Sequence, residues 1–324
     1  QYEWERELGL ELPMGNATRR LVVKEAAGVV GAITPWNVPM QINVAKAASA
    51  LAAGCTVVLK AAPNTPWAAA LMGEAAARAE LPAGVFNVIT SQDKASLGEQ
   101  IVADPRIDVI SFTGSTMVGK RIMEAAAPTL KRVFLELGGK SANIVLDDAD
   151  LPAALQTGAG ICFHAGQGCA ITTRLLVPRS RYDEAIDMLK GMFEAVPFGD
   201  PSSMEQVMGP VVSRAQYDRV LNYIEIGKAE GARLITGGEG LLSQTGGYYI
   251  QPTLFADVSN DMRIAQEEIF GPVLVVIPYE DDDDAVRIAN ESLYGLSGAI
   301  QSADPKRALR LARRIRVPSV TARV

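Results

Sequence analysis

The alternation of short apolar runs with alanine-rich stretches between Ala32 and about Ile144 constrains the fold most strongly. The apolar runs have the length of strands, and the alanine-rich stretches are long enough for helical crossovers. We therefore expect strands near 29–33, 56–60, 86–90, 109–112 and 133–137, and helices near 42–53, 66–79, 97–102 and 115–126. Such a β-α-β-α series predicts a mainly parallel sheet with helices on both faces.

The second half of the chain, from about Ser141, predicts a further α/β domain. Helices are expected near 151–162, 181–194, 215–230 and 305–316, and strands near 174–177 and 273–279. A chain of 324 residues is longer than one hydrophobic core usually fills, so two domains are expected. The double glycine Gly138-Gly139 marks the boundary and gives domains 1–138 and 139–324.

Composition narrows the class of protein. A hydrophobic fraction of 48%, a charged fraction of 21% and a net charge of -6 are ordinary for a soluble enzyme and argue against a nucleic-acid partner. Three cysteines and one histidine, without a Cys-x-x-Cys pair, predict neither a disulfide framework nor a metal site. This cysteine usage favours a reducing cytoplasm. We expect no membrane partner, because no apolar run is long enough to span a membrane.

Cys169 is the candidate nucleophile. It ends the stretch Phe163-His164-Ala165-Gly166-Gln167-Gly168-Cys169, a glycine-flanked bend in which a thiol can reach a ligand. Cys162, in contrast, lies in an apolar run, where cysteine is usually structural. A cysteine hydrolase would need His164 as its base, but the short spacing to Cys169 favours a structural histidine.

Two polar side chains suit acid–base and oxyanion chemistry. Glu136 lies inside the apolar run 133–137. If the side chain is buried, its pKa should be raised, which would suit it to proton transfer. The alternation of side chains along a strand equally allows an exposed position. Asn37 follows the turn Thr34-Pro35-Trp36, and its amide can donate to an oxyanion or form an Asx turn before Pro39.

Possible phosphate contacts follow two of the expected strands. The stretch Gly114-Ser115-Thr116-Met117-Val118-Gly119 joins a strand to a helix, so it either binds a phosphate or forms a tight turn capped by Ser115. Lys60 is the last residue of an expected strand. Its ammonium group either contacts a ribose or phosphate of a ligand or lies on the protein surface. Gly139-Lys140-Ser141 resembles the end of a P-loop, but position 134 is phenylalanine, which excludes a nucleoside triphosphatase.

Several segments together resemble the aldehyde dehydrogenase superfamily, in the order that the family has them and over nearly the whole chain. They are Ile33-Thr34-Pro35-Trp36-Asn37, Thr56-Val57-Val58-Leu59-Lys60, Ser111-Phe112-Thr113-Gly114-Ser115, Leu135-Glu136-Leu137-Gly138-Gly139-Lys140-Ser141, Gly166-Gln167-Gly168-Cys169 and Glu267-Glu268-Ile269-Phe270-Gly271-Pro272. The resemblance implies a Rossmann-like cofactor domain, a catalytic domain, and oxidation of a small aldehyde to an acid with NAD or NADP.

The resemblance also implies the roles of individual residues. Cys169 would be the nucleophile and would form a hemithioacetal and then a thioester. Asn37 would form the oxyanion hole together with the Cys169 backbone amide. Glu136 would be the general base. The cofactor would contact Trp36, Lys60, Gly114, Ser115, Leu137, Glu268 and Phe270. A strand near 18–24 would serve oligomerisation, since family members are homo-oligomers.

The chain departs from the family pattern in three places. Pro63 stands where many members carry a ribose-binding acid, so NAD and NADP both remain candidates, and His164 replaces a usual asparagine. Beyond Arg316 we expect no strand, because Pro318 would lie in its interior. We therefore expect a protein that is truncated at both ends, and whose catalytic domain is incomplete at its carboxyl end. Such a chain should have little dehydrogenase activity and form no defined oligomer. A non-catalytic remnant and a cofactor-independent cysteine esterase are the alternatives.

Overall fold

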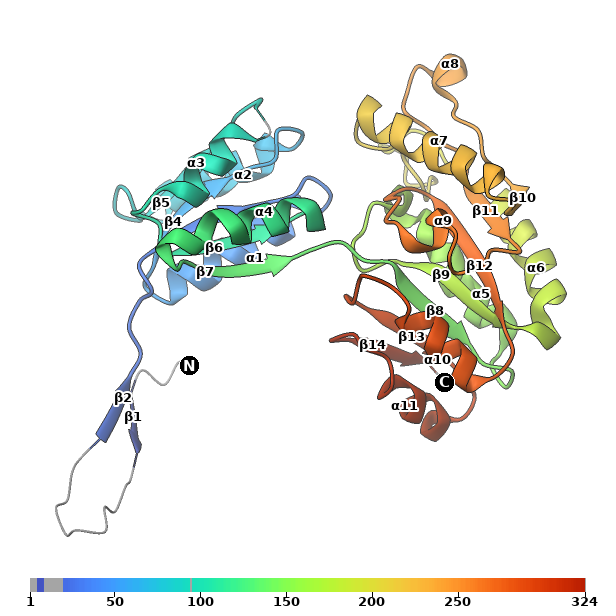
Figure 1. Cartoon of the computed structure of the whole chain (residues 1–324). Helices are drawn as coiled ribbons and strands as arrows, with labels where there is room; N and C mark the ends of the chain where they lie inside the picture. Colours follow the sequence, from blue (N-terminus) through green and yellow to red (C-terminus); the bar gives the residue numbers. More distant parts are fainter. Residues whose placement is uncertain (1–4, 9–19, 94, 324) are drawn as a thin grey trace, which may run out of the picture. The chain divides into compact units, whose positions relative to one another are not determined.

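The computed structural model of the chain describes residues 5–8, 20–93 and 95–323. The chain divides into two compact units, Gln1–Leu137 and Gly138–Val324 (Figure 1). Each unit has its own central sheet and its own hydrophobic core. No helix among the described residues is long and apolar enough to cross a membrane.

The first unit contains a five-stranded, entirely parallel sheet in the order β5-β4-β3-β6-β7. Its strands are β3 (Val29–Ile33), β4 (Thr56–Lys60), β5 (Phe86–Ile89), β6 (Val109–Thr113) and β7 (Arg132–Glu136). Its helices are α1 (Pro39–Ala52), α2 (Pro66–Arg78), α3 (Ser96–Ala103) and α4 (Thr116–Ala126). The predicted β-α-β-α series and parallel sheet are therefore confirmed.

Helices cover both faces of this sheet because its central strands are apolar on both sides (Figure 1). On one face, Val30, Val57 and Leu59 pack with Ala47 of α1 and Ala69 of α2. The other face belongs to a separate cluster from β3, β6, α3 and α4, made up of Ile33, Ile101, Val102, Ile107, Ile110, Phe112, Ile122 and Ala126.

The strand order creates a topological switch point between β3 and β6. From β3 the chain moves outward to β4 and β5, and then returns to place β6 and β7 on the other side of β3. The connections that leave β3 and β6 thus diverge to opposite faces. In open α/β sheets, ligands bind in the crevice that this divergence opens at the carboxyl ends of the strands.

The second unit contains a seven-stranded sheet in the order β10-β11-β12-β9-β8-β13-β14, parallel except for β10 against β11. Its strands are β8 (Ser141–Val145), β9 (Thr172–Pro178), β10 (Arg233–Thr236), β11 (Thr253–Ala256), β12 (Val273–Tyr279), β13 (Gly298–Gln301) and β14 (Val320–Arg323). Its helices include α5 (Leu151–Ala159), α6 (Tyr182–Glu194), α7 (Arg214–Ala229), α8 (Leu242–Thr245), α9 (Arg263–Gln266), α10 (Asp282–Asn290) and α11 (Pro305–Ala312).

The expectation that no strand follows Arg316 was wrong. Strand β14 pairs in parallel with β13, and the Gly298 amide donates to the Ser319 carbonyl at 3.0 Å. Pro318 precedes β14 instead of lying inside it, so its missing N–H removes no ladder hydrogen bond.

The structure also changes the bounds of one predicted helix and one predicted strand. The helix predicted over 151–162 ends at Ala159, because a 3₁₀ segment (Gly160–Gly166) follows and turns left-handed at His164 and Ala165. The strand predicted near 18–24 is β2 (Arg20–Val23), which pairs antiparallel with β1 (Glu5–Leu8), while positions 18 and 19 lie outside the described residues.

Candidate active site

The candidate residues of the first unit follow the carboxyl ends of neighbouring parallel strands. Asn37 comes after β3, Lys60 ends β4, Gly114 comes after β6, and Glu136 ends β7. Because the strands are parallel, these positions share one edge of the sheet. The sheet topology therefore brings together residues that are far apart in the sequence.

A cavity of about 630 Å³ lies at this edge, beside the switch point. Of the residues predicted to contact a cofactor, Trp36, Lys60 and Gly114 line it. Ser115 instead caps α4, where its Oγ accepts from the Val118 amide at 3.4 Å. Leu137 packs so closely on Gly119 that a Cβ there would come 2.7 Å from the leucine side chain.

Lys60 is a buried side chain, not a surface lysine. Only 4% of it is exposed, and the Thr34 amide and hydroxyl both donate to its carbonyl, at 3.2 and 3.3 Å. Burial lowers the pKa of Lys60, and the charge of Asp93 opposes this shift. A buried ammonium on a cavity wall is suited to bind hydroxyl or phosphate oxygens.

Glu136 is exposed at the end of β7. Of the two positions that the sequence allowed, buried and exposed, the structure shows the exposed one. Its negative charge acts on Lys46 of α1, whose Nζ donates to the Ser111 Oγ at 3.0 Å. Burial lowers the pKa of Lys46 and Glu136 opposes that effect. The sequence interpretation missed Lys46, although it is the single charged residue in α1.

In the second unit, two glycines bring distant segments into contact. A Cβ at Gly138 would overlap the Glu268 carboxylate, and one at Gly139 would come 2.6 Å from the Cys169 carbonyl oxygen. The Gly139 amide also donates to Glu268 Oε1 at 3.2 Å. At position 139 only glycine permits this close packing, whereas a side chain at 138 would displace the flexible Glu268 carboxylate. The segments that carry Gly138, Cys169 and Glu268 meet at the amino ends of β8, β9 and β12.

The bend before Cys169 is held in an uncommon conformation. His164, Ala165 and Gly166 have φ angles of 60°, 51° and 69°, which are costly for residues other than glycine. A Cβ at Gly166 would overlap the Gly271 carbonyl. The Gln167 side chain holds the bend, because its Oε1 accepts from the Val212 amide at 2.9 Å and its Nε2 donates to the His164 carbonyl at 3.1 Å.

Helix α7 holds the segment that contains Glu268 and Phe270. Arg219 Nη2 donates to the Glu268 carbonyl at 2.6 Å, and Gln216 Nε2 donates to the Phe270 carbonyl at 2.8 Å. Phe270 itself has a left-handed φ of 63°. Burial raises the pKa of the Glu268 carboxyl, while the Gly139 amide and the charges of Arg219 and Lys140 oppose that shift.

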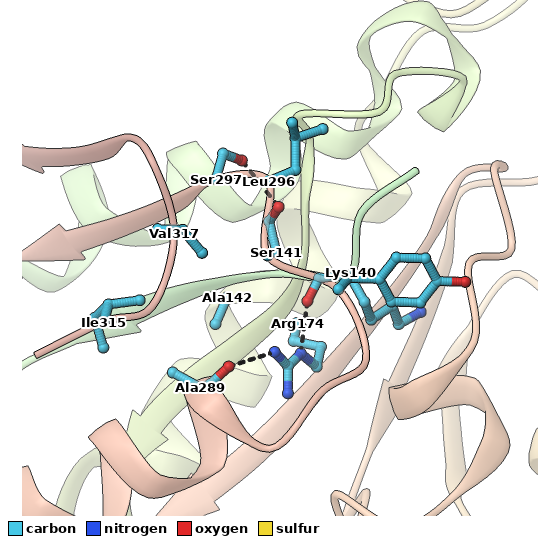
Figure 2. Close-up of a pocket in the computed structure, with 11 residues that line it drawn as sticks. Lys140, Ser141, Ala142, Arg174, Ala289, Leu296, Ser297, Ile315 and Val317 are labelled. Carbon is cyan, nitrogen blue, oxygen red and sulfur yellow. Dashed lines mark hydrogen bonds between the residues drawn. The ribbon is translucent and has the colours of Figure 1, made fainter. Parts of the chain in front are cut away.

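Arg174 holds the segment that follows Gly138-Gly139, at Lys140 (Figure 2). Its guanidinium, 1% exposed, donates at 2.9 Å each to the carbonyls of Lys140, Ile288 and Ala289 and to Asn260 Oδ1. Lys140 is fully buried as well, and desolvation, with the nearby charge of Arg174, lowers its pKa to about 7. Arg174 thereby ties the start of β8 to the end of α10.

Replacing Arg174 by methionine should lower the free energy of unfolding of the second unit by about 3–5 kcal/mol, because buried acceptors lose a charged donor. Chemical denaturation monitored by circular dichroism measures this. Arg179→Met is the matched control: Arg179 pairs with Glu280 on the surface, where an ion pair contributes about 0–1 kcal/mol. Equal effects of the two substitutions would contradict the assignment.

Among the three cysteines, Cys169 should react fastest with iodoacetamide. It is partly exposed, whereas Cys55 and Cys162 are buried, and burial raises the pKa of Cys162 to about 12. The thiolate is the reacting form, so a buried thiol of high pKa reacts slowly. Mass spectrometry after limited alkylation measures the order, and earlier labelling of Cys55 or Cys162 would disprove it.

Comparisons with known proteins agree with these motifs. The family model "Aldehyde dehydrogenase family" matches residues 2–323. A 3-succinoylsemialdehyde-pyridine dehydrogenase of a Pseudomonas species is 45% identical over 98% of this chain and 65% of its own length. The geranial dehydrogenase of Castellaniella defragrans is 47% identical over 95% of this chain and 63% of its own length.

A solved structure of an aldehyde dehydrogenase also resembles this chain. The aldehyde dehydrogenase of Mycobacterium tuberculosis, complexed with NAD+, is 44% identical and superposes with a TM-score of 0.93, covering 99% of this chain and 65% of that one. The chain thus spans about 65% of the length of such relatives. With a family model matched over nearly all of its residues, the chain belongs to the aldehyde dehydrogenase family.

Proposed function

We propose that the protein oxidises an aldehyde to a carboxylic acid with NAD or NADP. The first unit would bind the cofactor and the second would supply the nucleophile. The observation that carries this proposal is the packing of the Cys169 carbonyl and the Glu268 carboxylate against Gly138-Gly139, which ties a partly exposed thiol to a segment predicted to contact the cofactor. The cavity at the switch point of the first sheet supports it.

The residues of the chain suit a covalent mechanism. The Cys169 thiolate adds to the aldehyde carbon, and the Asn37 amide and the Cys169 backbone N–H stabilise the resulting oxyanion. A bound nicotinamide dinucleotide supplies the hydride acceptor that no side chain provides. Glu136 then takes a proton from the water that hydrolyses the thioester, releasing the acid and restoring the thiol.

The donors around the cavity fit a dinucleotide. Trp36, Lys60 and Gly114 would hold the nucleotide at the sheet edge, with Lys60 directed to ribose or phosphate oxygens. Ser115 and Leu137 would extend this contact from the first unit, and Glu268 and Phe270 from the second. The related Mycobacterium tuberculosis enzyme was solved with NAD+, which supports this assignment.

The decisive test is a screen of purified protein against aldehydes with both cofactors, following the absorbance of the reduced cofactor. Aldehyde-dependent cofactor reduction would support the proposal. Ester hydrolysis without cofactor, in the absence of cofactor reduction, would indicate a cysteine esterase instead. Nucleotide binding without turnover of either kind would indicate a non-catalytic remnant.

Discrimination between NAD and NADP should stay below roughly a hundredfold. Pro63 lines the cavity beside Lys60, and it has no charge to repel a 2′-phosphate and no acceptor for a 2′-hydroxyl. Specificity constants for both cofactors measure this. Pro63→Glu should shift the preference toward NAD, and a several-thousandfold preference in the unmodified protein would contradict the prediction.

We further propose a cytoplasmic location and, for this chain, no defined homo-oligomer. None of the three cysteines forms a disulfide, which suits a reducing compartment. Strand β2 exposes Leu21, Val22 and Val23, and exposed apolar side chains favour association without a defined stoichiometry. Size-exclusion chromatography tests the second part, and a single monodisperse oligomer would contradict it.

A further inference from the structure

An ion pair connects two helices at the rim of the cavity in the first unit. Arg121 Nη2 of α4 donates to Glu99 Oε1 of α3, and both residues line the cavity. Together with Lys60 they are the charged side chains that line it among the described residues. Glu99 is therefore the one carboxylate on this part of the cavity wall, and the family motifs do not include it.

The wall beside the ion pair is apolar. Val102 of α3 and Val118, Ile122 and Ala125 of α4 line the cavity, at the three- and four-residue spacing that forms one helix face. Apolar side chains from two helices, with a polar group at one edge, suit an aromatic base with polar edge atoms. The geometry thus indicates a compartment for a base.

The base in this compartment is the adenine, given the proposed function. The nicotinamide must reach the substrate at Cys169, which belongs to the second unit. The residues proposed to act at the reacting carbon, Asn37, Glu136 and Cys169, are not among those that line the cavity. The opposite end of the dinucleotide therefore occupies the compartment between α3 and α4.

We propose that Glu99 selects the adenine base by accepting a hydrogen bond from its exocyclic amino group, and that Arg121 is a positioning residue that holds the Glu99 carboxylate. This inference rests on the proposed function. Arg121 bonds one carboxylate oxygen, Oε1, and a carboxylate has acceptor sites on both oxygens. A base with a 6-oxo group would place an acceptor against this carboxylate.

The ion pair is not needed for the fold. The side chains of Arg121 and Glu99 are 62% and 58% exposed, and such surface pairs contribute little stability. Substituting either residue should therefore leave the protein folded. Changes in nucleotide selectivity can then be read without a loss of structure.

The experiment compares the affinities of NAD and nicotinamide hypoxanthine dinucleotide by isothermal titration calorimetry on the whole chain. The two ligands differ at position 6 of the base, which carries an amino donor in the first and an oxo acceptor in the second, and at N1, which is an acceptor in the first and an N–H donor in the second. NAD should bind roughly tenfold more tightly, as expected for one hydrogen bond to a charged group. Glu99→Gln should reduce the difference to about twofold or less, because the amide can donate as well as accept.

Two further variants complete the test. Arg121→Gln should also weaken the selectivity, because the carboxylate loses the guanidinium that holds it. Glu74→Gln, which removes an acid from the exposed Glu74–Arg78 pair on α2, should behave like the unmodified protein. Thermal unfolding of each variant confirms that it is folded.

The possible outcomes separate this inference from the proposed function. Selectivity for NAD that is lost in Glu99→Gln and kept in Glu74→Gln supports the inference. Equal binding of both dinucleotides, or selectivity that survives Glu99→Gln, overturns it and leaves the proposed function intact. Failure of both dinucleotides to bind the unmodified chain overturns the inference together with the proposed function.

Discussion

Replacing Cys169 by alanine should lower the rate of aldehyde oxidation by roughly 10⁴-fold or more, because no covalent intermediate can form. The bend that carries Cys169 is held by Gln167 and by the close approach of Gly166 to Gly271, so removing the sulfur should leave the loop in place. Steady-state cofactor reduction, measured on the purified protein with an aldehyde that it oxidises, gives the effect.

The control separates loss of chemistry from loss of structure. NAD affinity should be unchanged in Cys169→Ala, because the nucleotide cavity is lined by residues of the first unit. Cys55→Ala should retain aldehyde oxidation, since Cys55 is buried beside β4. Substantial activity in Cys169→Ala would exclude this thiol as the nucleophile.

Glu136→Gln should lower steady-state turnover by roughly 10²–10⁴-fold while a rapid first turnover remains. The carboxylate is proposed to activate the water that hydrolyses the thioester, so its loss should slow that step and not the formation of the thioester. The protein should then release one equivalent of reduced cofactor per site in a burst, followed by slow turnover. Rapid-mixing absorbance measurements resolve the two phases.

The exposed position of Glu136 makes this variant interpretable, because an amide of the same shape at a surface position should not disturb the fold. Glu124→Gln, also exposed and located on α4, is the matched control and should keep full turnover. Equal loss of the burst and of the steady state would show that Glu136 acts before hydrolysis or has only a structural role.

The sequence by itself determined the architecture of the first unit and predicted which thiol is the nucleophile. Strands buried on both faces are short apolar runs, and the helices between them are long enough to be recognised, so β3 to β7 appear directly in the pattern. The carboxyl-end positions of Asn37, Lys60 and Glu136 follow from the same pattern. Cys169 is predicted as the nucleophile because it lies in a glycine-flanked bend.

Short elements of the second unit were less visible. Strands β10, β11, β13 and β14, of four residues each, were not predicted; unlike β5, they do not fall within a regular strand–helix alternation, and they form because neighbouring strands supply their hydrogen bonds. The same limitation led to the wrong expectation for the segment after Arg316. Pro318 was taken as a break within a strand, whereas it lies just outside one.

Only the tertiary structure decided which side chains meet. Glycine is required at 139 because the Cys169 carbonyl packs against it, and Gly138 leaves room for the Glu268 carboxylate, both across long sequence separations. The bonds of Arg174 to Lys140 and Ala289 and the pair between Glu99 and Arg121 likewise join separate elements. Periodicity and spacing describe local conformation, whereas these contacts depend on how strands and helices pack, so no local pattern could reveal them.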